Sequence, residues 1–126
     1  MLIAEVSERC GMSQDTLRYY ERVGLIPPVN RNKSGIRDYT EEDLRWVEFI
    51  KCMRGVSLPI ESLIEYVRLF QLGDDTIEAR QQLLHEQRQA LAARMAEMQI
   101  VLDRLDDKIA RYDQTIGRQE RTLNRS

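Results

Sequence analysis

The side chains with the clearest chemical potential lie in one short basic segment near the start of the chain. Between Ser13 and Arg37, five Lys and Arg residues stand against two acidic residues. Four polar or aromatic side chains in this segment recur at the spacing i, i+3, i+4 and i+7: Asp15, Arg18, Tyr19 and Arg22. This spacing places them on one helical face, where they could reach into a groove of a nucleic acid. The local excess of positive charge is the relevant signal, although the whole chain carries a net charge of −2.

A second group suited to phosphate follows a pair of prolines that ends the helix. The polar residues 30–35 lie between two short extended pieces and predict a small hairpin. Side chains alternate between the two faces of a strand, so Arg37 and Tyr39 are expected on one face and Ile36 on the other. A cation and a phenol that point the same way suit a phosphate backbone.

The cysteines and the single histidine limit metal and redox chemistry. Two cysteines, Cys10 and Cys52, cannot complete a tetrahedral metal site, and in a reducing compartment they are expected to be free thiols. His85 is expected on a charged helix, where a solvated imidazole is the default. We therefore expect no metal and no cofactor.

Cys52 is the residue that could sense a reactive molecule. It is expected about 120° away from the apolar stripe of its helix, whereas Cys10 lies on such a stripe. Nearby Arg45, Lys51 and Arg54 could favour the reactive thiolate, although the dipole at a helix C-terminus opposes it. A small side chain chosen only for packing is the alternative.

Length and composition exclude other classes. A chain of 126 residues has room for one compact domain and an extension. It carries no nucleophile–base–acid set and no phosphate-cradling glycine loop, so we do not expect an enzyme. Its uncharged apolar runs are short and its first residues lack a signal-peptide pattern, so we expect a cytoplasmic protein without a membrane partner.

Two short helices separated only by a turn are expected to hold the basic face. Residues 2–10 carry an apolar stripe that Gly11 can terminate, and Ser13 is a good N-cap for a second helix through Val23. Leu17 and Tyr20 are expected to point inward from that second helix. This arrangement predicts a helix-turn-helix.

Two further helices complete the predicted domain. Thr40 and Asp43 resemble a capping box at the start of a third helix that ends near Gly55. Its inward residues are expected to be Trp46, Phe49, Ile50 and Met53. A fourth helix after Pro59 ends near Gly73, which gives one small domain over 1–73.

One long helix is predicted over 75–116, because no Gly or Pro interrupts this stretch. A heptad pattern runs through it for about five repeats. Its d positions are Ile77, Leu84, Leu91, Met98, Leu105 and Tyr112, and its a positions are Gln81, Arg88, Met95, Leu102, Ile109 and Ile116. At about 1.5 Å per residue the helix spans roughly 60 Å, so most of the seam needs a partner, for which we expect a second copy. Residues 117–126 are expected to form a frayed tail.

The segment SQDTLRYYERVGLIP at 13–27 closely resembles the N-terminal signature of the MerR family of transcriptional regulators. The resemblance continues through GIRDY at 35–39, similar to the family's wing, and GVSL at 55–58. Ile36 departs from the pattern, where the family more often has an aromatic residue. The resemblance implies a mainly α fold, in which a winged helix-turn-helix domain precedes a long helix that forms an antiparallel coiled-coil dimer.

The same resemblance implies a function. A homodimer would bind a pseudo-palindromic site in double-stranded promoter DNA and distort it for RNA polymerase when an effector arrives. Matching the motif assigns base-edge or groove contacts to Gln14, Thr16, Arg18 and Tyr19. It assigns phosphate contacts to Tyr20, Arg22, Lys33, Arg37 and Tyr39. For Tyr20, core packing is an equal alternative because the helical wheel turns its ring inward.

The resemblance also bears on the effector, the molecule that switches the regulator. Metal-sensing members carry cysteines around the dimerisation helix, and this chain has none after Cys52. The chain is similar to a small branch that responds to aldehydes and other thiol-reactive stress, which implies that modification of Cys52 switches transcription. Two alternatives stay open: a regulator of a small non-covalent ligand with Cys52 inert, and a coiled-coil adaptor without regulated DNA binding.

Overall fold

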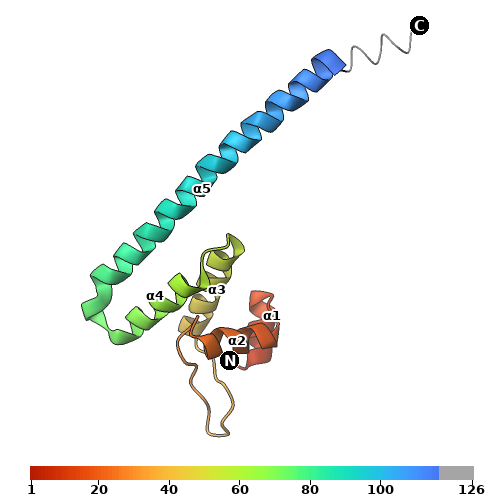
Figure 1. The fold of residues 1–126 in the computed structure, drawn as a ribbon. Helices are drawn as coiled ribbons and strands as arrows, with labels where there is room; N and C mark the ends of the chain where they lie inside the picture. Colours follow the sequence, from red (N-terminus) through yellow and green to blue (C-terminus); the bar gives the residue numbers. More distant parts are fainter. Residues whose placement is uncertain (117–126) are drawn as a thin grey trace. The chain divides into compact units, whose positions relative to one another are not determined.

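Five α-helices follow one another along the chain in the computed structural model, which describes residues 1–116 (Figure 1). Their bounds are α1 (Ile3–Cys10), α2 (Gln14–Val23), α3 (Glu41–Gly55), α4 (Ile60–Leu72) and α5 (Ile77–Arg111). A 3₁₀ turn at Asp74–Thr76 precedes α5, and a π-helical turn at Tyr112–Ile116 follows it. Contacts divide the chain into one unit that runs from Met1 to Gln87 and a second that begins at Arg88. The predicted tail at 117–126 lies outside the described residues.

The predicted helix-turn-helix is present as α1 and α2. Gly11 ends α1 in the left-handed conformation, with φ of 64°, which a residue with a Cβ adopts only at a cost. The hydroxyl of Ser13 then caps α2 by accepting a hydrogen bond from the backbone N–H of Thr16. Only three residues separate the two helices, so α2 is held close against α1.

The loop between α2 and α3 differs from the predicted pair of strands. It extends away from the helices (Figure 1), and its pairing is reduced to a single β-bridge between Arg31 and Arg37. The side-chain oxygen of Asn32 accepts hydrogen bonds from the backbone N–H groups of Ser34 and Ile36. Backbone hydrogen bonds from Asn32 to the Ile36 carbonyl and from Asp38 to the Asn30 carbonyl cross the loop on either side of the bridge. These bonds and the Asn32 side chain together hold the loop without a longer strand ladder.

The prediction for α3 was right about its start and partly wrong about its buried face. The capping box of Thr40 and Asp43 is formed in both directions. The buried residues are Leu44, Val47 and Ile50, whereas Trp46 is only half-buried, as are Phe49 and Met53. The reason is that α3 packs on two sides: one face meets the core, and the aromatic face meets α4.

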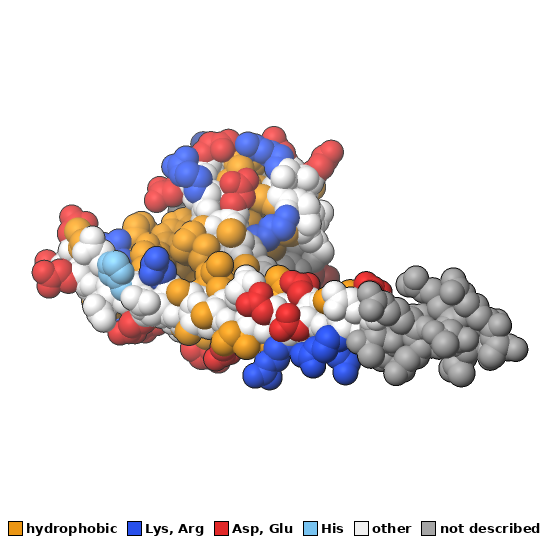
Figure 2. Space-filling view, turned by 90° about the horizontal axis from the view of Figure 1, so that it is seen from above, with side chains coloured by type: hydrophobic (Ala, Val, Ile, Leu, Met, Phe, Trp, Pro, Cys, Tyr) orange, Lys and Arg blue, Asp and Glu red, His pale blue; other side chains and the backbone are white. Residues whose placement is uncertain are grey.

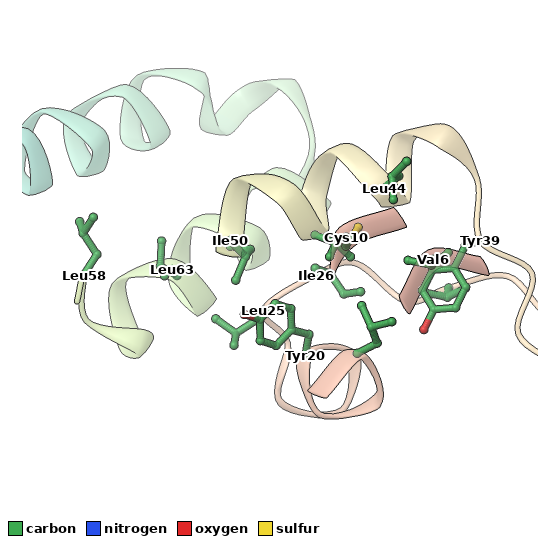
Figure 3. Close-up of a cluster of buried hydrophobic side chains, with 13 residues drawn as sticks. Val6, Cys10, Tyr20, Leu25, Ile26, Tyr39, Leu44, Ile50, Leu58 and Leu63 are labelled. Carbon is green, nitrogen blue, oxygen red and sulfur yellow. The ribbon is translucent and has the colours of Figure 1, made fainter. Parts of the chain in front are cut away.

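The core of the first unit is built from hydrophobic residues. Figure 3 shows the cluster, in which side chains from α1, α2, α3, α4 and the intervening loops converge. Val6, Leu17 and Val47 are completely buried, and no charged or polar residue is buried with them in the described chain. Cys10 belongs to this cluster, and its burial raises the pKa of its thiol. This thiol is therefore kept protonated and unreactive.

The apolar seam of α5 is uncovered in the single chain. Met95, Met98, Leu102 and Leu105 each expose half or more of their surface. The helix begins at Ile77 rather than at residue 75, because Thr76 turns its hydroxyl back to the carbonyl groups of Leu69 and Gly73. Within residues 1–116, no helix is both long and apolar enough to cross a membrane.

Candidate nucleic-acid interface

The exposed face of α2 presents a connected set of polar side chains. Arg18 donates hydrogen bonds to Gln14 Oε1 at 3.3 Å and to Asp15 Oδ1 at 3.0 Å. At the start of the helix, the hydroxyls of Ser13 and Thr16 lie 2.7 Å apart. Three of the four residues assigned to base contact therefore lie on the first turn and a half of α2. The guanidinium of Arg18 is held there by neighbours that a base edge could replace.

The later part of this face is aromatic and cationic. The guanidinium carbon of Arg22 lies 5.5 Å from the centre of the Tyr19 ring, within range of a cation–π contact. Tyr19 is half-buried and packs against the core, whereas Arg22 is exposed. The Tyr19 ring thus holds Arg22 in an extended position from which its charge faces solvent.

The loop after α2 adds further cations. Lys33 is exposed at the tip, and no hydrogen bond or ion pair holds its ammonium group within residues 1–116. Arg31 donates to the carbonyl oxygen of Gly35 at 2.8 Å, which steadies the turn from inside. Lys33 is therefore the cation of this loop that is left for a phosphate.

Arg37 is already engaged by a carboxylate that the sequence analysis did not single out. Its Nε donates to Glu21 Oε1 at 2.6 Å, and the two side chains are only 25% and 15% exposed. The second oxygen of Glu21 accepts the backbone N–H of Val29 at 2.8 Å. The only signal in the sequence was that Glu21 is one of two acidic residues in the basic segment, and is thus a candidate partner for a nearby arginine.

The two tyrosines assigned to phosphate lie in the core. Tyr39 is only 2% exposed and its hydroxyl is buried without a hydrogen-bond partner, so a phosphate contact would require the ring to leave the core. Tyr20 is 7% exposed, in keeping with the inward alternative (Figure 3). Burial raises the pKa of both phenols, so both stay neutral. Alternation along a strand was expected to put Arg37 and Tyr39 on one outward face, but this stretch forms no strand: Arg37 pairs with Glu21 of α2, and Tyr39 lies in the core.

Cys52 is exposed, whereas Cys10 is buried. Two cations that could favour its thiolate are used elsewhere: Lys51 donates to the carbonyl oxygen of Cys10 and Arg54 to that of Leu58, each at 2.6 Å. His85 is exposed on α5. Among residues 1–116 no group of three or more His, Cys, Asp or Glu side chains could hold a metal ion.

Comparison with protein families gives a direct result for this arrangement of helices. The family of MerR HTH regulatory proteins matches residues 1–69, and the family described as MerR, DNA binding, matches residues 44–118. The chain belongs to the MerR family. The matched families are regulatory proteins rather than enzymes, and together they include both the helix-turn-helix and α5.

Individual MerR proteins match over most of the chain. The HTH-type transcriptional regulator AdhR of Bacillus subtilis is 62% identical over 91 residues, which cover 72% of this chain and 65% of that protein. A MerR family structure from Listeria monocytogenes is 50% identical with a TM-score of 0.93, and the match covers 98% of this chain and 94% of that one. HiNmlR, a MerR family regulator lacking the sensor domain and bound to promoter DNA, is 32% identical with a TM-score of 0.80 and 92% coverage of both chains.

Proposed function

We propose that this protein is a homodimeric transcriptional regulator that binds promoter DNA through α2 and the following loop. The observation that carries the proposal is the exposed polar and cationic face of α2, set on a helix-turn-helix of the MerR family. A helix of this kind lies in the major groove with its first residues toward the base edges. The match to HiNmlR supports this use of the fold, because that relative is bound to promoter DNA over nearly the same length of chain.

The proposed contacts follow from exposure along this face. Gln14, Thr16, Arg18 and Tyr19 lie where base edges or groove walls would be. Arg22 and Lys33 carry charges that face solvent, and they are proposed to contact phosphates. Arg37 could reach a phosphate while it remains paired with Glu21. We assign Tyr20 and Tyr39 to support of this surface from within, in place of the phosphate contacts that the motif suggested.

We propose that residues 1–73 form the DNA-binding domain, that residues 75–116 form the dimerisation helix, and that residues 117–126 form a tail. The uncovered seam of α5 supports a second copy as the partner, since exposed apolar positions at heptad spacing are stable only when they are covered. Two copies would present two α2 helices to successive turns of a pseudo-palindromic site. The proposed location is the cytoplasm, and the proposed further partner is RNA polymerase at that promoter.

A titration of the full chain with its own promoter DNA tests this proposal. Gel shift should show one retarded complex that contains two copies of the chain, and a pseudo-palindromic footprint. Affinity should fall steeply with salt, because each phosphate contact releases counterions. A chain that ignores this DNA at low salt would instead be the coiled-coil adaptor.

We further propose that Cys52 is the site of a thiol-reactive signal. Its exposure supports this role, since attack requires access. With an aldehyde, a bond forms between the sulfur and the carbonyl carbon, the carbonyl π bond breaks, and the thiol proton ends on the oxygen. Cys10 provides an internal control, because its burial should keep it unmodified.

Replacement of Cys52 by serine should abolish the transcriptional response to an aldehyde and leave promoter affinity unchanged. The measurement is a reporter assay with and without aldehyde, paired with a gel shift of the purified variant. A Cys10→Ser variant should keep the response. An unchanged response in Cys52→Ser would favour the alternative, in which a small non-covalent ligand is the effector and Cys52 is inert.

A further inference from the structure

An aromatic pocket lies between α3 and α4, and none of its lining residues belongs to the proposed DNA contacts. It has a volume of about 260 Å³ and is lined by Glu42, Arg45, Trp46 and Phe49 from α3 and by Tyr66 and Phe70 from α4. The four rings include both phenylalanines and the single tryptophan of the chain. All four are half-buried, so each ring keeps part of its surface open. Figure 2 likewise shows hydrophobic side chains gathered on one part of the surface.

The rings form a continuous wall. The centre of Trp46 lies 4.9 Å from that of Phe70, 5.8 Å from that of Tyr66 and 6.3 Å from that of Phe49. Phe49 and Tyr66 close the set, with their centres 5.9 Å apart. These tilted and edge-on contacts fix the rings against one another. A pocket that is mostly aromatic with a few polar groups is typical of small-molecule sites, and this volume, just below their usual range, limits the ligand to a small molecule.

The charges around the pocket select the sign of the ligand. Arg45 and Glu42 are exposed at its edge, and neither has an ion-pair partner within the described part of the chain. A second cation, Arg80, lies with its guanidinium carbon 5.4 Å from the centre of the Phe70 ring. Hydrogen bonds to Thr76 Oγ1 and the Gly73 carbonyl hold it there. One cation and one carboxylate therefore line the pocket, and a second cation lies against one of its rings.

The position of Arg80 also argues against a cationic ligand. Aromatic rings attract cations at their faces, and the Phe70 ring already has a cation of the protein in that role. A second cation at this ring would be repelled by Arg80. An anionic group near Arg45 would meet no such repulsion, apart from the single carboxylate of Glu42.

We propose that this aromatic pocket binds a small arylalkyl or similar apolar monocarboxylate. The apolar part of the ligand lies against the four rings, and its carboxylate pairs with Arg45. None of the proposed DNA contacts lines this pocket, so it can be tested without DNA.

The test uses the full chain and two probes with the same phenyl group and a four-carbon chain, phenylbutyrate and phenylbutylamine. Trp46 is the only tryptophan, so its fluorescence reports this pocket alone. Phenylbutyrate should change the emission in a saturable way, and phenylbutylamine should bind more weakly. An Arg45→Gln variant should raise the Kd for phenylbutyrate about two- to fivefold, as expected for an exposed charge pair. The matched Glu42→Gln variant should leave that Kd unchanged or lower it.

Other outcomes overturn the proposal. No saturable change with phenylbutyrate would show that the rings are only packing. Equal or tighter binding of the amine would show a site of the opposite sign. Apparent affinity that falls as the protein concentration rises would show that a second copy of the chain covers the pocket. An unchanged Kd in Arg45→Gln would remove the assigned role of the guanidinium.

Discussion

Glu21 ties α2 to the loop that follows it, using both oxygens of its carboxylate. One oxygen accepts from Arg37 and the other from the backbone of Val29. Both side chains of the ion pair are largely shielded, so water screens their attraction less than at an open surface. At the scale of single residues, this one carboxylate thus holds both sides of the loop, at Val29 and at Arg37.

Replacing Glu21 by glutamine should lower the free energy of unfolding by about 1 to 3 kcal/mol, because Arg37 loses its charged partner in a partly buried place. Urea denaturation measures the change. The matched control is Glu65→Gln, whose partner Arg68 is exposed on the same turn of α4. That control should show no comparable loss, since solvent screens an exposed pair. Equal losses in the two variants would contradict the role assigned to Glu21.

Tyr39 carries a hydroxyl that the fold leaves without a partner. A buried polar group without a hydrogen bond costs stability, so Tyr39→Phe should raise the free energy of unfolding by about 1 kcal/mol. Its affinity for promoter DNA should not change. Denaturation and gel shift of the same preparation measure both quantities, with the exposed Tyr112→Phe as control. Loss of DNA affinity in Tyr39→Phe alone would restore the phosphate contact that the motif suggested.

The buried phenols also make stability depend on pH in one direction. Burial raises the pKa of Tyr20 and Tyr39 above the ordinary value of 10.0. Above pH 10 the unfolded chain therefore loses these protons before the folded chain does. Their contribution to stability should be complete below that pH and should disappear as the pH rises through the folded values. Urea midpoints measured from neutral to alkaline pH test this, and a midpoint that rises in alkali would contradict it.

At the scale of elements, one face of α2 carries two arginines in different surroundings. Its first turns carry Arg18 among polar neighbours, and its last turn carries Arg22 beside an aromatic ring. The cap at Ser13 fixes where the helix begins, and the left-handed Gly24 fixes where it ends. This difference in surroundings predicts different consequences for the two arginines.

An Arg22→Ala variant should bind all DNA sequences more weakly and lower the slope of affinity against salt by about one unit, as for a lost phosphate contact. Arg18→Ala should instead cost about 1 to 3 kcal/mol on the preferred site and relax specificity at one base pair. Binding to a set of single-base operator variants at several salt concentrations separates the two effects. Identical behaviour of both variants would contradict the assignment of a phosphate contact to Arg22 and a base contact to Arg18.

At the scale of the whole molecule, the main feature is a row of exposed apolar side chains along α5. The a and d positions of α5 from Met95 to Tyr112 are largely exposed, and water does not favour so long a row of uncovered apolar side chains. The proposed dimer would bury this seam and at the same time supply the second α2 that a pseudo-palindromic site requires. In the proposed dimer, assembly and DNA recognition would be coupled through α5.

A Leu102→Asp variant should convert the dimer to a monomer, because it places a charge in the middle of the seam. Ala93→Asp is the matched control, since it introduces the same charge at the f position on the opposite face of the heptad. Light scattering after gel filtration measures the mass of each. The helical signal of residues 1–87 and the fluorescence of Trp46 should remain native-like in both. A Leu102→Asp chain that stays dimeric would show that the a and d positions of α5 do not form the dimer interface.

The amino-acid sequence by itself determined the order of the helices, the caps at the start of α2 and α3, and the apolar spacing along α5. These features depend on spacing and on neighbours within a few residues, so periodicity and capping chemistry are sufficient to predict them. The motif at 13–27 likewise identified the family that the comparisons confirm. Cys10 as a core thiol and Cys52 as an exposed one followed from the same helical periodicity.

Only the tertiary structure decided which way the loop residues face and what they meet. Glu21 and Arg37 are sixteen residues apart, and the pocket joins α3 to α4 across a turn. Alternation along a strand could pair Arg37 with Tyr39 but could not show that Arg37 meets Glu21 and that Tyr39 lies in the core. Such features depend on how distant segments pack, and packing is set by the balance of all buried contacts at once rather than by any local pattern.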